Sequence, residues 1–183
     1  TTPDIFPKYL AYKGPNAFKQ RYFLAGTLSS LTGMYNGYEL CENIPSPVKE
    51  ELADSEKYQY KVHNWKGPGI QDFVRRVNTA RQEHVALQEY DNLDFHYCAN
   101  DQLMVYSKKS GDDVILCVCN MDMDNAQEGM VELDMAKLGL SQDSFFFLKD
   151  LITDESFVWR GNRNFVRLDP AKAPGHLLVL KKI

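Results

Sequence analysis

Apolar residues recur with helical spacing in the first half of the chain and with strand spacing in the second half. In the first half, Gly14 and Pro15 form a helix breaker, and the apolar spacing after them predicts a helix over residues 16–29. One face of this helix carries Phe18, Tyr22 and Ala25. Ala25 and Gly26 are both small, so we expect a neighbouring element to pack closely against the helix at this point.

Three further elements are predicted before the strands begin. An apolar run over residues 31–37, bounded by glycine, predicts one buried strand. Residues 38–69 are rich in proline, charge and aromatic side chains, which predicts a long functional loop, since aromatic residues argue against disorder. Helical spacing returns at Ile70 and predicts an amphipathic helix. Its apolar stripe consists of Ile70, Phe73, Val74, Val77 and Ala80.

The second half reads as eight short strands separated by turn signals such as Gly111-Asp112 and Asp169-Pro170. Eight alternating runs at this spacing predict an antiparallel β-sandwich. The expected strands cover residues 91–98, 103–108, 113–119, 129–134, 144–149, 156–159, 164–168 and 176–181.

The composition limits the class of function. The sequence has 183 residues, 44% of them hydrophobic, and a formal net charge of −4. It has no basic block that would suggest nucleic acid, and no apolar run near the roughly 20 residues that a membrane helix needs. The first residues lack the features of a signal peptide. We therefore expect neither nucleic acid nor a membrane as a partner.

The cysteines and histidines indicate no metal site. The four cysteines form no Cys-x-x-Cys motif, and the four histidines are scattered singly without ligand spacing. Cys117 and Cys119 lie two apart in an expected buried strand, so their side chains should share one face as reduced thiols. Reduced thiols favour a cytoplasmic location.

The first part is incomplete as a fold of its own. Its order of elements makes only two βα units, whereas a parallel sheet needs several such units to cover both of its faces. Followed by a complete sandwich, it is typical of the tail of a larger protein. The fold class expected is therefore α/β plus all-β.

Three motifs are specific enough to name a family. They are GYELCENIP (37–45), DSEKYQY (54–60) and WRGNRNFVRLDP (159–170). In this order they resemble the bacterial α-1,4-glucan:maltose-1-phosphate maltosyltransferases of the α-amylase superfamily. The resemblance implies that residues 1–88 are the C-terminal part of a catalytic (β/α)8 barrel, from the end of strand seven onward. Residues 89–183 would then be the C-terminal antiparallel β-sandwich.

The family's reaction, as the resemblance implies it, is a retaining transfer of maltosyl units from maltose-1-phosphate to the non-reducing end of α-1,4-glucans. Such chemistry needs a carboxylate nucleophile and a carboxylic acid about 5 Å apart. Both would come from barrel strands four and five, in the N-terminal part of the enzyme that is missing here. We therefore expect this chain alone to be inactive. The resemblance also implies an enzyme that needs no cofactor and forms a homodimer.

Asp4 is the catalytic residue that the resemblance assigns. The superfamily places a third carboxylate after strand seven, where it holds hydroxyls of the reacting sugar, and Thr1-Thr2-Pro3-Asp4 matches that position. Most amylases have His where Pro3 stands, whereas the phosphate-using family has Asn-Thr-Pro-Asp, so Pro3 fits and Thr1 departs from the pattern. Without the resemblance, Asp4 would be a helix-cap or turn residue.

The long loop supplies the expected substrate-binding residues Lys57, Glu56 and Tyr58. Lys57 can donate to sugar hydroxyls, Glu56 can accept from them, and the ring of Tyr58 can stack on an apolar sugar face. The alternative is a short helical turn starting at Asp54 in which both charges are simply solvated. Glu39, which follows the expected strand, could approach the pocket or tie the loop down.

Two other functions remain open from the sequence. One is a different α-amylase-type enzyme, such as a hydrolase or a trehalose synthase, against which the TTPD and DSEKY motifs argue. The other is a non-catalytic glucan-binding module, which an exposed row of aromatic residues on one sandwich face would support. The sequence shows no obvious row, because Phe145–Phe147 are consecutive and must divide between the two faces.

Overall fold

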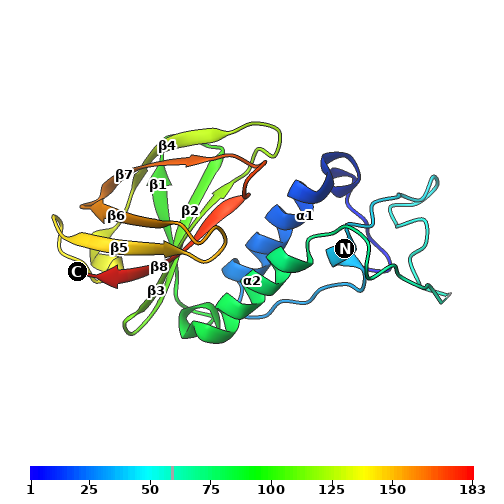
Figure 1. Ribbon diagram of the computed structural model, residues 1–183, viewed down its shortest axis with the longest axis horizontal. Helices are drawn as coiled ribbons and strands as arrows, with labels where there is room; N and C mark the ends of the chain where they lie inside the picture. Colours follow the sequence, from blue (N-terminus) through cyan, green and yellow to red (C-terminus); the bar gives the residue numbers. More distant parts are fainter. Residues whose placement is uncertain (59) are drawn as a thin grey trace.

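The computed structural model describes residues 1–58 and 60–183 (Figure 1). The helices are α1 (Lys8–Leu28), η1 (Tyr38–Leu40), α2 (Gln71–Glu83), η2 (Val85–Leu87) and α3 (Met135–Leu138). The strands are β1 (Leu93–Cys98), β2 (Leu103–Ser110), β3 (Asp113–Asn120), β4 (Gln127–Glu132), β5 (Phe145–Asp150), β6 (Ser156–Arg160), β7 (Arg163–Leu168) and β8 (Gly175–Lys182). The strands gather at one end of the molecule, α1 and α2 lie beside them, and the long loop forms the other end.

Helix α1 begins earlier than its apolar spacing predicted. Its second segment covers the expected helix, but a short helical segment over residues 8–13 precedes it. The two join at Gly14, whose φ of 65° and ψ of −161° are not helical. Glycine adopts this conformation without a clash, and Pro15 then starts the second segment where its missing N–H has no helical partner to lose. The breaker is confirmed as a kink inside one helical element.

The buried strand expected over residues 31–37 is wrong. None of this segment belongs to a strand, and the side chain of Leu31 is 85% exposed. A strand needs a neighbour to satisfy its backbone N–H and C=O groups. Within the described residues, all eight strands pair with one another, and none lies against this segment.

Helix α2 follows the expected amphipathic pattern. The apolar stripe is buried: Ile70, Phe73, Val74, Val77 and Ala80. The stripe packs against α1 where Gly26 lies, because a Cβ added at Gly26 would lie 2.7 Å from Cγ1 of Val77. The close approach expected from the small residues of α1 is therefore confirmed.

All eight expected strands are present, with boundaries shifted by two residues or fewer. They form one antiparallel sheet in the order β6-β5-β8-β3-β2-β1-β4-β7. The antiparallel pairing is as expected, but the strands make one sheet and not the two separate sheets of the predicted sandwich. The sheet curls until β6 and β7, its two end strands, come into contact, so it is nearly closed. β4 starts two residues earlier than expected, since Gln127 and Glu128 pair with Leu168 and Arg167 of β7 although their side chains are polar.

The sheet has apolar cores on both of its faces. The inner core lies within the curled sheet and includes Leu116, Val118, Phe146, Leu148 and Leu178. The outer core lies between β2, β3, β8 and the helices, and includes Phe18, Phe23, Tyr106, Ile115 and Cys117. The second core ties the helical part of the chain to the sheet.

The side-chain predictions for the sheet are confirmed. Cys117 and Cys119 are buried free thiols in the same core. Phe146 is buried while Phe145 is exposed, so the consecutive phenylalanines divide between the two faces.

No helix of the described residues is long and apolar enough to cross a membrane.

Candidate functional site

Asp4 and Lys57 come together although 53 positions separate them in the chain. The ammonium of Lys57 forms an ion pair with the carboxylate of Asp4, and its Nζ lies 3.8 Å from Oε1 of Glu51. The hydrogen bond with Asp4 raises the pKa of Lys57. The loop segment that carries DSEKY therefore lies against the N-terminal segment of the chain, as a shared site requires.

Local hydrogen bonds shape the turn that presents Asp4. The hydroxyl of Thr2 accepts from the backbone N–H of Asp4 at 3.2 Å and of Ile5 at 3.0 Å. Asp4 is thus a turn residue, and its carboxylate is 61% exposed. The turn interpretation and the functional one are compatible, since the turn directs the carboxylate toward Lys57.

Tyr58 and Glu56 take different places beside Lys57. The ring of Tyr58 is 89% exposed, with its centroid 5.5 Å from Nζ of Lys57. Glu56 points the other way, and its Oε2 lies 3.0 Å from Nε2 of His63. The structure therefore brings Asp4, Lys57 and Tyr58 to one surface and leaves the Glu56 carboxylate on its inner side. Gln59, within the same motif, lies outside the described residues.

His63 belongs to a charged cluster that the sequence did not reveal. Its ring bridges two carboxylates, with Nδ1 3.0 Å from Oε1 of Glu42 and Nε2 facing Glu56. Nζ of Lys61 lies 2.6 Å from Oε2 of Glu42. Glu42 and Glu56 fall within two of the motifs described above, but nothing in those motifs predicts that they meet at His63, because a single histidine carries no spacing signal. Within the described residues, no group of three or more His, Cys, Asp or Glu side chains could hold a metal ion.

Tyr38 and Glu39 stabilise the start of the long loop. The hydroxyl of Tyr38 donates to the carbonyl of Phe18 at 2.7 Å, and its ring is buried. The backbone carbonyl of Glu39 accepts from the N–H of Ile70 at 2.7 Å. The backbone of Glu39 thus ties the loop down, but its carboxylate does not supply the expected hydrogen bonds, because Oε2 is buried without a partner.

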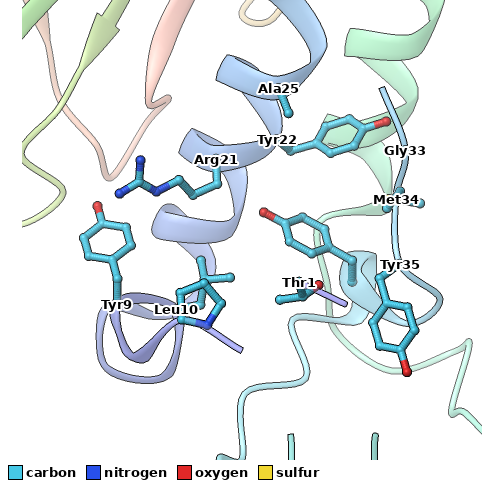
Figure 2. A pocket seen from close by; sticks show the side chains of 11 residues that line it. Thr1, Tyr9, Leu10, Arg21, Tyr22, Ala25, Gly33, Met34 and Tyr35 are labelled. Atoms are coloured by element: carbon cyan, nitrogen blue, oxygen red, sulfur yellow. The ribbon is translucent and has the colours of Figure 1, made fainter. Parts of the chain in front are cut away.

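A cavity of about 340 Å³ lies along α1 (Figure 2). Its walls come from α1, the N-terminal segment and residues 33–38, and its lining is mostly apolar and aromatic. Arg21 is the charged residue in it, and its guanidinium lies 4.7 Å from the ring centroid of Tyr9. At the other end, the hydroxyl of Tyr35 donates to the carbonyl of Ser55, which connects the cavity wall to the DSEKY loop. Asp4 and Lys57 lie outside the cavity.

Solved structures define the class of fold. The chain superposes on a maltogenic α-amylase from Thermotoga neapolitana with a TM-score of 0.72 and 14% identity, covering 100% of this chain and 40% of that one. An α-amylase from Geobacillus thermoleovorans in complex with acarbose gives a TM-score of 0.65 at 16% identity, covering 92% of this chain and 34% of that one. The chain therefore has the fold of part of an α-amylase-type enzyme.

Sequence comparison then shows which enzymes the chain is similar to. The family described as "GLGE, C-terminal" matches residues 95–180. An α-1,4-glucan:maltose-1-phosphate maltosyltransferase from Streptomyces coelicolor is 44% identical over 99% of this chain and 28% of its own length. The enzymes of that name from Rhodospirillum rubrum and Mycobacterium tuberculosis are 43% and 37% identical, over 94% and 97% of this chain and 26% of their own lengths.

The chain is thus homologous, over nearly its whole length, to the C-terminal portion of the α-1,4-glucan:maltose-1-phosphate maltosyltransferases. The family resemblance of the three motifs is confirmed. The chain spans about a quarter of the length of these relatives, 26–28% of each.

Proposed function

We propose that this chain is the C-terminal part of an enzyme that transfers maltosyl units from maltose-1-phosphate to the non-reducing end of α-1,4-glucans. In this proposal, residues 1–88 complete a catalytic (β/α)8 barrel and residues 89–183 form the C-terminal sandwich. The homology over nearly the whole chain carries the proposal, because it includes the helical part as well as the sheet. The exposed segment at 31–37 also fits, since strand eight of a barrel would find its neighbours in the rest of the enzyme.

The proposed roles follow from the position of each side chain. Asp4 would accept hydrogen bonds from hydroxyls of the reacting sugar, which become more acidic as the ring takes positive charge. Lys57 would contact the donor away from the bond that breaks, and the exposed ring of Tyr58 would stack on a sugar face. The ion pair of Asp4 and Lys57 supports a shared site. The carboxylate of Glu56 would support this surface from its inner side, where it contacts His63.

The nucleophile and the acid would come from the remainder of the enzyme. The test is release of phosphate from maltose-1-phosphate by the full-length enzyme, with and without a glucan acceptor. We expect acceptor-dependent release and elongated glucan, and no release by the 183-residue chain alone. Acceptor hydrolysis without use of maltose-1-phosphate would favour an α-amylase-type hydrolase, and conversion of maltose to trehalose would favour a trehalose synthase.

A glucan-binding surface on the sheet is the second candidate. Phe95 and Tyr97 alternate on β1, Tyr97 pairs with Glu132 of β4, and Met130 of β4 pairs with Phe165 of β7. These pairings place the apolar side chains on one face, and all of them are exposed. Glycogen affinity electrophoresis tests this surface, since a Tyr97→Ala, Phe165→Ala variant should migrate faster than the wild type only if the surface binds glucan.

Assembly and location follow the same proposal. We propose that the enzyme is a homodimer. We also propose a location in the reducing cytoplasm, which the buried free thiols of Cys117 and Cys119 support. Analytical ultracentrifugation of the full-length enzyme measures the oligomeric state, and cell fractionation measures the location. A monomer at micromolar concentration would remove the dimer from the proposal.

A further inference from the structure

His63 is enclosed between two carboxylates in the interior of the long loop. Its side chain is only 4% exposed, and each ring nitrogen lies 3.0 Å from a carboxylate oxygen, Nδ1 from Glu42 and Nε2 from Glu56. A ring that carries both of its protons donates one hydrogen bond to each carboxylate. The two carboxylates lie 14 positions apart in the chain, so the ring connects the two sides of the loop.

The backbone around His63 fits the ring closely. Gly37 has a φ of 82°, and a Cβ added there would lie 2.7 Å from Cε1 and 2.9 Å from Nδ1 of His63. The indole of Trp65 is tilted against the ring, with 5.1 Å between centroids. Any other residue at position 37 would displace the imidazole. The site is therefore built for this ring, and the ring does not simply fill a gap.

Glu56 links this cluster to the proposed donor site. Its φ is 56°, a left-handed conformation that residues other than glycine rarely adopt. Its carboxylate accepts hydrogen bonds from Nε2 of His63 at 3.0 Å and from Asn36 at 3.2 Å, which hold the residue in that conformation. Lys57 follows directly, so the backbone turn at Glu56 sets the direction in which the Lys57 ammonium leaves the loop toward Asp4.

We propose that His63 is a positioning residue, which bridges Glu42 and Glu56 and thereby holds Lys57 and Tyr58 beside Asp4 when its ring carries both protons. The inference deepens the proposed function, on which it rests for the identity of the donor. His63 itself does not touch the proposed substrate surface. Its effect should therefore appear in donor binding more than in the chemical step.

The charged groups around the His63 ring determine how the bridge between the two carboxylates depends on pH. The charged groups that face His63 are the carboxylates of Glu42 and Glu56, and the Lys61 ammonium lies behind Glu42. The amide nitrogen of Asn36 also lies 2.9 Å from Nε2. When Nε2 carries a proton both groups are donors, so Asn36 then donates only to Glu56. The hydrogen bond with Glu42 raises the pKa of His63, and that with Glu56 adds to it against the opposing effect of burial. Because the folded-state pKa is raised, the bridge is complete below the ordinary value of about 6.5 and is lost as the pH rises through the folded value.

At low pH the bridge is limited by protonation of Glu42 and Glu56. Burial opposes ionisation of Glu42, but hydrogen bonds from Lys61 and His63 outweigh it and lower the pKa. The hydrogen bond with His63 lowers the pKa of Glu56 as well. Both carboxylates therefore stay charged down to below their ordinary range, and the bridge is lost only when the pH falls through these lowered values.

The experiment compares three forms of the full-length enzyme: wild type, His63→Gln, and His84→Gln as a matched control. His84 also pairs with a carboxylate, Asp113 at 2.8 Å, but at the junction of helix and sheet. The KM for maltose-1-phosphate and kcat are measured from pH 5.5 to 9. The donor phosphate ionises with a pKa of about 6 in phosphomonoesters, so the difference between wild type and His63→Gln is the informative quantity.

We expect the KM of the wild type to rise with pH and to approach that of His63→Gln at high pH. At low pH the KM of His63→Gln should be higher by roughly tenfold, an effect that a misplaced positioning contact can produce, with a smaller change in kcat. His84→Gln should follow the wild type. Parallel profiles for wild type and His63→Gln would overturn the proposal.

A second measurement does not depend on activity. Amide hydrogen exchange of peptides covering residues 51–58, in the full-length protein, should speed up as the pH rises beyond the intrinsic increase, and should already be fast in His63→Gln. Glu42→Gln, which keeps the shape of its side chain, should give the same result if His63→Gln fails to fold. If His63→Gln and Glu42→Gln both protected residues 51–58 from exchange as well as the wild type does, the bridge would be refuted. Loop protection with no use of maltose-1-phosphate would refute the proposed function alone.

Discussion

The buried carboxylate of Asp150 offers the sharpest test of what stabilises the sheet. It is fully buried at the end of β5 and accepts four hydrogen bonds. Oδ1 accepts from the backbone N–H groups of Ile152 at 2.9 Å and Leu177 at 3.2 Å. Oδ2 accepts from the hydroxyl of Thr153 at 2.8 Å and from Nδ1 of His176 at 2.7 Å. One side chain thus connects the β5–β6 turn to β8.

The substitution Asp150→Ala removes the acceptor from all four donors. A buried donor left without a partner costs about 1–3 kcal/mol. Counting only the three donors on buried residues, Ile152, Leu177 and His176, the free energy of unfolding should fall by at least about 3 kcal/mol. Asp150→Asn keeps one oxygen for the two backbone groups, so we expect a loss of about 1–2 kcal/mol.

Urea unfolding of the 183-residue chain, followed by tryptophan fluorescence, measures the effect. Trp159 is buried in the sheet against Phe146, whereas Trp65 is exposed, so a Trp65→Phe background isolates the signal from the sheet. Asp143→Ala, at an exposed carboxylate, is the matched control and should stay within about 0.5 kcal/mol of the wild type. A loss below about 1 kcal/mol for Asp150→Ala would refute the reasoning.

The pH dependence provides an independent check on Asp150. Burial opposes ionisation of its carboxyl, but the hydrogen bonds from His176, Ile152 and Thr153 outweigh burial and lower its pKa. A depressed folded-state pKa stabilises the fold above the ordinary value of about 3.8, and this contribution is lost as the pH falls through the folded value. The stability difference between wild type and Asp150→Asn should therefore shrink in acid. A difference that does not change with pH would assign the effect to packing.

Three further predictions follow from the proposed site, the helix contact and the buried thiols. In the full-length enzyme, Asp4→Asn should lower kcat about 100-fold or more with little change in donor Kd, whereas Lys57→Ala should chiefly raise the Kd; near-normal turnover of Asp4→Asn would remove its assignment. Gly26→Val should lower the free energy of unfolding by about 1–3 kcal/mol, because the helices would have to separate; an unchanged urea midpoint would contradict the packing. Burial raises the pKa of Cys117, and raises that of Cys119 to about 12, so neither thiol should react with a disulfide reagent at pH 8 before unfolding; rapid native-state labelling at either position, located by mass spectrometry, would show that they are accessible.

Contacts within the loop explain how a segment with many charged and exposed side chains is ordered. The loop has one short helix and an isolated bridge between Pro45 and Leu52. Tyr38 and Leu52 bury apolar side chains, and polar contacts such as the Lys61–Glu42 pair order other parts of the described loop. We expect such a segment to respond to pH and to ligand more than the sheet does, because few buried apolar contacts oppose its opening.

The sequence by itself determined the elements whose signal is local. The alternation of apolar residues predicted eight strands, and the apolar stripe of α2 predicted its buried face, because periods of 2 and 3.6 follow directly from backbone geometry. Gly14 and Pro15 predicted a break for an equally local reason. Three motifs, read as a resemblance, predicted the family. The assignment of Asp4 as catalytic and of Lys57 as substrate-binding stays a prediction.

The tertiary structure decided everything that depends on distant parts of the chain. The strand order, in which β8 lies between β5 and β3, follows from pairing that no local period encodes. The apolar run at 31–37 has a strand-like composition but no neighbour in this chain, so composition alone gave the wrong element. The cluster around His63 exists only because the loop folds back on itself, since hydrogen bonds between side chains 7 and 21 positions apart leave no spacing signal in the sequence.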